Sequence, residues 1–150
     1  MTVNPPDISL RAYAKINLGL LVTEKRPDGY HEIRTVFHRI DLFDDIELRL
    51  TEGLSVISTG EAAPSGESNI CYTAALLLQE HLHVRKGVEI LLRKRIPIGA
   101  GLGGGSANAA AVLQNLPRLW GSDVSPDVLH EFALRLGSDV PYFPNRKYRD

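Results

Sequence analysis

The apolar positions of the chain predict strands in its first part and mainly helices after them. Residues 8–23 alternate between two faces, which is typical of a half-buried strand. The apolar face of this strand consists of Ala12, Ala14, Ile16, Leu18 and Leu20. The opposite face carries Lys15 and Asn17, and such polar residues are unusual on an otherwise apolar strand. We therefore treat Lys15 and Asn17 as candidate functional residues.

Turn residues divide the rest of this first part into further strands. Residues 27–29 (Pro-Asp-Gly) predict a tight turn, because proline fixes φ at one corner and glycine accepts a positive φ near the end. Extended runs follow at 30–41, 46–50 and 54–58, with a second turn expected at Asp44-Asp45. Since these strands follow one another through short turns, we expect them to pair in antiparallel fashion.

Helical periodicity dominates the second half of the chain. A first helix is expected to begin at Ser68 or Asn69, because either side chain can cap the N–H groups of a first turn. A strand at 87–95 separates it from a second helix, and a third helix is expected after the cap residue Ser125. The apolar stripes of the first two helices are Ile70, Ala74, Leu77, Leu78 and Leu82, and Ala109, Val112, Leu113, Leu116 and Trp120. This order predicts an α+β fold, in which a mostly antiparallel sheet packs against helices.

A glycine-rich stretch at 97–108 (Pro-Ile-Gly-Ala-Gly-Leu-Gly-Gly-Gly-Ser-Ala-Asn) joins the last predicted strand to the second helix. Glycine lets a ligand approach the backbone, and a helix start directs free N–H groups at an anion. The stretch therefore predicts a phosphate-binding loop. It is not a Walker loop, since no lysine follows the glycines. A dinucleotide fingerprint is matched by Gly99, Gly101 and Gly104, but the acid at the right distance, Asp123, lies between two predicted helices, which disfavours a nicotinamide enzyme.

Composition narrows the class of protein only slightly. The 150 residues are 43% hydrophobic and 23% charged with a net charge of −1, which is typical of a globular protein without a pull toward nucleic acid or anionic membranes. The one cysteine, Cys71, excludes an internal disulfide and is expected in the core. For the basic run Arg93-Lys94-Arg95, a solvated strand end and a phosphate-attracting patch are equally good interpretations. The absence of a spanning segment or leader pattern favours the cytoplasm.

Four segments together resemble the GHMP small-molecule kinases. The stretch 97–108 resembles their ATP motif, and 14–18 (Ala-Lys-Ile-Asn-Leu), 26–31 (Arg-Pro-Asp-Gly-Tyr-His) and 137–143 (Gly-Ser-Asp-Val-Pro-Tyr-Phe) follow the family in the same order. The resemblance implies the GHMP kinase N-terminal domain, with the ribosomal protein S5 domain 2-like fold. It also implies an enzyme that uses ATP and Mg²⁺ to phosphorylate a small-molecule alcohol.

The same resemblance implies a role for each candidate residue. Asp139 is expected to be the catalytic base and Lys15 its partner, because a nearby ammonium keeps a carboxylate ionised and stabilises phosphoryl oxygens. Tyr30 and His31 are expected to hold a cytosine base of the substrate, and Asn17 to orient the substrate. ATP is expected to contact Pro97, Gly99, Gly101, Leu102, Gly103, Gly104, Gly105, Ser106 and Asn69. For Asn69 and Ser106, a helix N-cap is the alternative role.

The segments most resemble those family members that phosphorylate the 2-hydroxyl of a cytidine-diphosphate-linked methylerythritol in the non-mevalonate route to isoprenoids. A GHMP kinase for mevalonate-type or homoserine-type alcohols is one alternative, and a nucleotide-binding fragment without catalysis is another. Because family members carry a second, C-terminal domain, we expect residues 1–150 to be the ATP-binding N-terminal domain with the second domain absent. A homodimer stays open, whereas nucleic-acid and membrane partners are not expected.

Overall fold

The computed structural model describes residues 5–29, 31–61 and 63–143, and for residues 20–23 and 31–35 the backbone alone. The strands are β1 (Ile8–Lys25), β2 (His31–Thr51), β3 (Leu54–Gly60) and β4 (Gly87–Lys94). The helices are α1 (Ile70–Leu82), α2 (Gly104–Leu119) and α3 (Pro126–Leu136), with short 3₁₀ turns η1 (Gly66–Ser68) and η2 (Val140–Tyr142). The expected succession is confirmed in outline: strands come first, and helices follow that are separated by one strand.

The strands form one sheet in the order β1-β2-β4-β3. The pairs β1–β2 and β2–β4 are antiparallel, whereas β3 and β4 are parallel. The α+β class with a mostly antiparallel sheet is therefore confirmed, but the expectation that successive strands pair is wrong for β2 and β3. The chain passes through α1 between β3 and β4, and such a crossover returns the second strand parallel to the first. As a result, β4 lies between β2 and β3.

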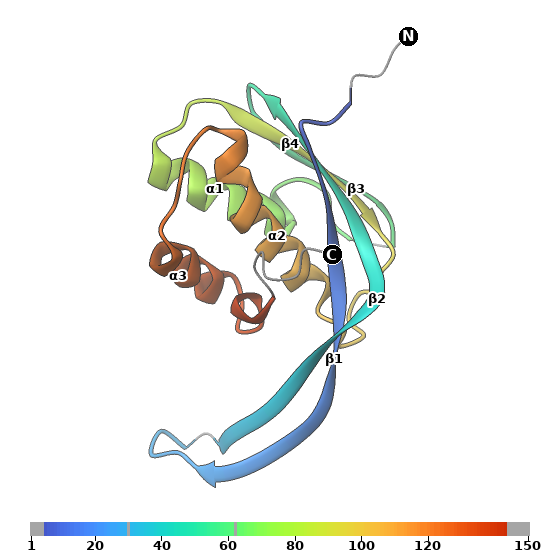
Figure 1. Cartoon of the computed structure of the whole chain (residues 1–150), viewed down its shortest axis with the longest axis vertical. Helices are drawn as coiled ribbons and strands as arrows, with labels where there is room; N and C mark the ends of the chain where they lie inside the picture. The colour runs from blue at the N-terminus through green and yellow to red at the C-terminus, as the bar shows by residue number, and fades with distance from the viewer. Residues whose placement is uncertain (1–4, 30, 62, 144–150) are drawn as a thin grey trace.

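The three helices cover one face of the curved sheet (Figure 1). Strand residues that face them are buried alternately, as in Ile46 and Leu48 of β2 and Ile90 and Leu92 of β4. Helix α2 lies at the centre of this layer and buries most of its length. Its buried residues are Ala107, Asn108, Ala109, Ala110, Val112, Leu113, Leu116 and Pro117. The core thus fixes the start of α2, where the glycine-rich stretch ends.

The turn expected at Asp44-Asp45 does not exist. Strand β2 continues through both residues to Thr51, and Asp44 is fully buried inside the fold. Aspartate favours turns locally, but here a buried lysine, Lys94, forms an ion pair with Asp44. This tertiary contact overrides the local preference.

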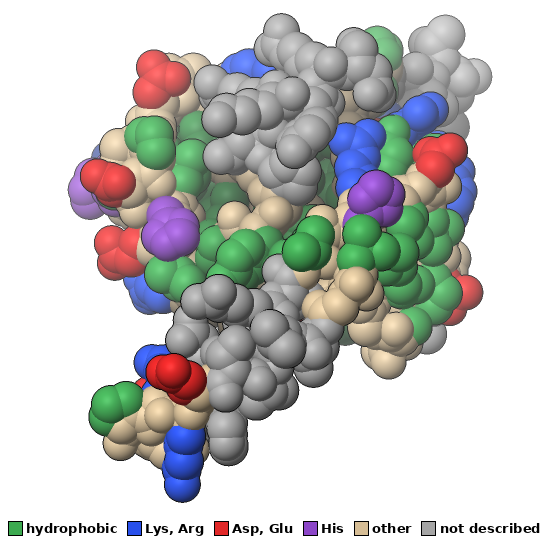
Figure 2. All heavy atoms as spheres, turned by 60° about the horizontal axis from the view of Figure 1, so that its bottom comes forward, with side chains coloured by type: hydrophobic (Ala, Val, Ile, Leu, Met, Phe, Trp, Pro, Cys, Tyr) green, Lys and Arg blue, Asp and Glu red, His purple; other side chains and the backbone are tan. Residues whose placement is uncertain are grey.

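Strands β1 and β2 continue beyond the body of the sheet as a curved two-stranded ribbon (Figure 1). The predicted turn closes it: Gly29 has a φ of 90° and its N–H donates to the Arg26 carbonyl over 3.0 Å. Charged side chains gather at the tip of the ribbon (Figure 2, lower left). Leu18, expected on the buried face, is 60% exposed, because β1 has register irregularities on both sides of Lys15–Asn17 and none of the described helices covers the ribbon.

Candidate active site

The glycine-rich stretch forms the connection from β4 to α2, and helix α2 begins without a side-chain cap. The N-cap residues of α1 and α3 are Asn69 and Ser125, whose side chains accept hydrogen bonds from Cys71 N and Val128 N. The N-cap residue of α2 is instead Gly103, which has a φ of 70° and offers no side chain. The first N–H groups of a helix need partners, and an anion is a suitable one. The start of α2 therefore has the form of a phosphate site.

Lys15 of β1 holds this loop from the side of the sheet. Its backbone N–H donates to the Leu102 carbonyl over 2.9 Å, and its Nζ donates to the Gly101 carbonyl over 3.2 Å. Nζ also donates to Asn17 Oδ1 over 3.2 Å. Lys15 is only 7% exposed although it carries a charge. The two polar residues that stood out on β1 therefore lie together at the loop.

The structure brings Asp139 to the same lysine. Asp139 Oδ2 lies 4.0 Å from Lys15 Nζ, although the two residues are 124 positions apart in the sequence. Asp139 directly precedes η2, which is fixed by the buried Val140 and by Gln114 of α2, whose amide donates to the Phe143 carbonyl. The Asp139 side chain is 45% exposed and so accessible to a ligand. A carboxylate and an ammonium next to a phosphate-type loop can ionise a hydroxyl and stabilise a transferred phosphoryl group.

Two aromatic rings lie beside this pair. Lys15 Nζ lies 4.9 Å from the centre of the Phe37 ring of β2, and Phe37 stacks on Tyr142 with ring centres 5.1 Å apart. The ring faces attract the ammonium group and restrict its position. Tyr142 is 64% exposed, so one face of this stack is accessible from solvent.

Two glycines of the loop are required by close packing. A Cβ on Gly103 would lie 2.6 Å from Phe143 Cζ and 3.0 Å from Lys15 Cε. A Cβ on Gly104 would lie 2.9 Å from Ile96 Cγ2. Gly105 has nothing within 4 Å of the corresponding position, and Gly99 and Gly101 have open space but positive φ. The glycines thus serve packing at two positions and backbone conformation at three, since Gly103 also has a positive φ.

The structure gives local roles to the other residues that were predicted to bind the nucleotide. Ser106 is the third residue of α2 and not its N-cap, which is Gly103. Asn69 caps α1, with Oδ1 accepting from Cys71 N over 2.9 Å and Nδ2 donating to the Pro64 carbonyl over 2.8 Å. Pro97 is exposed in the connection after β4. The cap interpretation of Asn69 is therefore confirmed, and that of Ser106 is wrong.

The predicted substrate residues lie mostly outside the described part of the structure. Tyr30 is not among the described residues, and His31 is described only as the backbone start of β2. Their assignment to a cytosine base stays a prediction. Asn17, the third residue of this group, is exposed and accepts from Lys15 Nζ.

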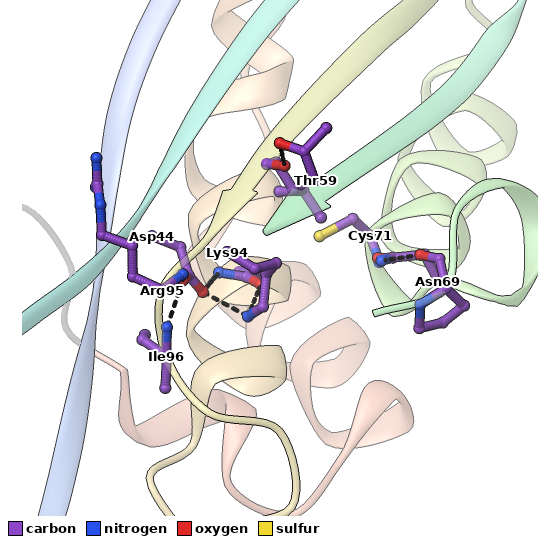
Figure 3. Close-up of polar contacts among 10 residues, drawn as sticks. Asp44, Thr59, Asn69, Cys71, Lys94, Arg95 and Ile96 are labelled. Atoms are coloured by element: carbon purple, nitrogen blue, oxygen red, sulfur yellow. Dashed lines mark hydrogen bonds and ion pairs between the residues drawn. The ribbon is translucent and has the colours of Figure 1, made fainter. Parts of the chain in front are cut away.

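The basic run Arg93-Lys94-Arg95 fits a solvated strand end at Arg93 and Arg95, whose side chains are exposed, but not at Lys94. Arg93 and Arg95 pair with acids of β2, Glu47 and Asp45. Lys94 is buried, and its Nζ donates to Asp44 Oδ2 over 2.5 Å and to Asn108 Oδ1 over 2.8 Å. Figure 3 shows Asp44 and Lys94 pointing toward each other. Periodicity could not find this group, because its members come from three separate elements.

Cys71 lies in the core, as expected. Desolvation by burial raises the pKa of its thiol from 9.0 to about 12. Two smaller effects act in opposite directions: Lys94 lowers this pKa and Asp44 raises it. A thiol with this pKa is protonated at neutral pH and is a poor nucleophile.

Among the residues that the structure describes, no group of three or more His, Cys, Asp or Glu side chains is arranged to hold a metal ion. No described helix has the length and apolar character needed to cross a bilayer.

Comparison with known proteins agrees with this geometry. The sequence model for the GHMP kinases N terminal domain matches residues 69–143, which is half of the chain. The chain therefore belongs to the GHMP kinases and carries their N-terminal domain.

Particular relatives are more specific. The chain is 51% identical over 140 residues to a 4-diphosphocytidyl-2-C-methyl-D-erythritol kinase of Chlorobium limicola, covering 93% of this chain and 49% of that protein. A crystal structure of 4-(cytidine 5'-diphospho)-2C-methyl-D-erythritol kinase superposes with a TM-score of 0.78 at 43% identity, over 91% of this chain and 48% of that one. A mevalonate kinase of Methanococcus jannaschii superposes with a TM-score of 0.61 at 18% identity, over 86% and 45%, and shares the fold alone. The chain spans about half the length of the relatives it matches.

Proposed function

We propose that this chain provides the ATP-binding half of a kinase that phosphorylates the 2-hydroxyl of 4-diphosphocytidyl-2-C-methyl-D-erythritol. The observation that carries the proposal is the meeting of Lys15, Asp139 and the uncapped start of α2 at one place. The chain shares about half of its aligned residues with relatives that are named for this substrate, and this similarity supports the choice of alcohol. In this proposal residues 1–150 act as one N-terminal nucleotide-binding domain. A homodimer and a cytoplasmic location stay predictions.

Each residue has a defined task in the proposed reaction. The N–H groups at the start of α2 bind phosphate oxygens of ATP, and the loop glycines let the phosphates approach the backbone. Asp139 accepts the proton of the substrate hydroxyl as that oxygen attacks the γ-phosphorus and the bond to the leaving ADP breaks. Lys15 lies beside the Asp139 carboxylate and stabilises charge on the transferred group.

Mg²⁺ accompanies ATP in phosphoryl transfer and neutralises charge on the phosphate oxygens. The residues present fit an ion that arrives with the nucleotide. Magnesium at such sites uses one or two protein oxygens besides phosphate and water, and the Ser106 hydroxyl in the first turn of α2 would supply one of them.

Phosphoryl transfer assays with three alcohols test the proposal. We expect transfer from ATP to 4-diphosphocytidyl-2-C-methyl-D-erythritol and not to mevalonate or homoserine. Asp139→Asn should lower kcat by about 10²–10⁴-fold, the usual contribution of a general base, with little change in ATP affinity. Asp127→Asn is the matched control, because Asp127 is exposed in the first turn of α3 and should have wild-type kcat.

Three results would contradict parts of the proposal. Transfer to mevalonate or homoserine instead would identify a different GHMP kinase. Nucleotide binding without transfer to any of the three alcohols would favour the non-catalytic alternative. Equal kcat in the Asp139→Asn and Asp127→Asn variants would remove Asp139 from the chemistry.

A further inference from the structure

A buried polar network connects both ends of the glycine-rich stretch to one carboxylate. Asp44 Oδ1 accepts from the backbone N–H groups of Arg95 over 2.6 Å and Ile96 over 2.9 Å, where the chain leaves β4. Asp44 Oδ2 accepts from Asn108 Nδ2 over 3.0 Å, one turn into α2. Residues 97–107 therefore form a loop and first helical turn whose two ends are bonded to the same side chain.

Lys94 completes the network. Its Nζ donates to Asp44 Oδ2 and to Asn108 Oδ1, so that Asp44, Lys94 and Asn108 bond to one another in a closed triangle (Figure 3 shows Asp44 and Lys94). The side chains of Lys94 and Asp44 are 3% and 0% exposed. Two of the three N–H groups of this buried ammonium therefore donate to Asp44 and Asn108.

The network also contacts the start of α2 directly. A Cβ on Gly104 would lie 3.2 Å from Lys94 Nζ, which means that the backbone of the first helical turn rests against the ammonium group. A shift of Lys94 would therefore move the N–H groups that point at the predicted phosphates. Asn108 controls the position of Lys94, since it binds both members of the ion pair.

We propose that Asp44, Lys94 and Asn108 are positioning residues that set the geometry of the phosphate loop. A buried ion pair adds little to stability compared with apolar residues of the same volume, but it fixes directions and distances. Here the directions fixed are those of the two chain ends that flank the loop. The inference rests on the proposed function, because it assumes that the loop binds the phosphates of a nucleotide.

Nucleotide binding by the Asn108→Ala variant tests this inference. Calorimetric affinities of the chain for AMP and, with Mg²⁺, for the non-hydrolysable ATP analogue AMP-PNP give the gain in affinity contributed by the additional phosphates. We expect Asn108→Ala to reduce that gain about tenfold, as for the loss of one well-placed hydrogen bond, and to leave AMP affinity unchanged. The variant keeps the charge of Lys94, so the loss cannot result from a missing cation.

Val112→Ala is the matched control, because Val112 lies one turn further along α2 and is fully buried. It should lose thermal stability and keep the wild-type gain. If Asn108→Ala does not fold, Asn108→Ser replaces it with the same expectation, since serine is too short to bond both Asp44 and Lys94. An unchanged gain in the Asn108 variant, or an equal loss in Val112→Ala, would overturn the inference while the proposed function stands. Absence of nucleotide binding by the wild type would instead contradict the proposed function and the inference with it.

Discussion

Lys15 connects three parts of the chain that are distant in sequence: its own strand, the loop carbonyl of Gly101, and Asp139 after α3. The sequence indicated Lys15, because a charged residue on an apolar strand is unusual, and Asp139, because its segment resembles a kinase motif. The sequence could not indicate the hydrogen bond from Lys15 Nζ to the Gly101 carbonyl, because every residue has a backbone carbonyl and its position depends on the fold. The same reason explains why Asp44, Lys94 and Asn108 were missed, as a buried ion pair is defined only by the fold.

Cys71 allows a prediction at the scale of one residue. Burial raises its pKa to about 12, so the thiol should resist alkylation in the folded protein at pH 8 and react only as the protein unfolds. The raised pKa also affects stability. Between pH 9.0 and about 12 the unfolded chain binds fewer protons at Cys71 than the folded one, so the free energy of unfolding should fall as pH rises.

Iodoacetamide labelling at increasing urea concentrations measures the first effect, and urea unfolding of the wild type and Cys71→Ala from pH 8 to 10.5 measures the second. The difference in pH dependence between the two proteins isolates the thiol. Rapid labelling of the native protein would contradict the burial of the Cys71 thiol, and identical pH dependence in both proteins would contradict its raised pKa.

At the scale of elements, the start of α2 has a tightly packed position, Gly104, next to an open one, Gly105. Gly104→Ala should lower the free energy of unfolding by about 1–3 kcal/mol, because its Cβ would overlap Ile96 at 2.9 Å in a well-packed core. Gly105→Ala is the matched control, since its Cβ meets nothing within 4 Å and alanine favours the helix by about 0.5–1 kcal/mol. Urea unfolding measures both variants. Equal stability of the two variants would contradict the close approach of Gly104 to β4.

Element types were largely predictable, but pairing was not. Alternation and helical stripes located the strands and helices to within a few residues, because these patterns depend on which side chains are buried. The parallel pair β3–β4 depends on where the crossover through α1 places β4, and the uninterrupted β2 depends on the Asp44–Lys94 contact. Both are tertiary effects that a local pattern does not contain.

At the scale of the whole molecule, the fold brings the residues proposed to act on ATP together at one place. Helix α2, the segment after α3 and the middle of β1 converge where the ribbon leaves the body of the sheet (Figure 1). The relatives are about twice as long as the part matched here, and the predicted cytosine residues lie in or next to the ribbon turn. The nucleotide half of the proposed site is therefore the part whose geometry the structure describes.

The most direct test of the central claim is a ¹H–¹⁵N NMR titration of the chain with AMP-PNP and Mg²⁺. Backbone N–H groups that bind phosphate change their chemical shifts, so we expect the largest changes at Gly101–Ser106, with smaller ones at Lys15 and Asp139. Adenosine should leave the shifts of the glycine loop nearly unchanged. The largest changes elsewhere in the assigned spectrum, or none at saturating analogue, would contradict the assignment of the β4–α2 loop as the ATP phosphate site.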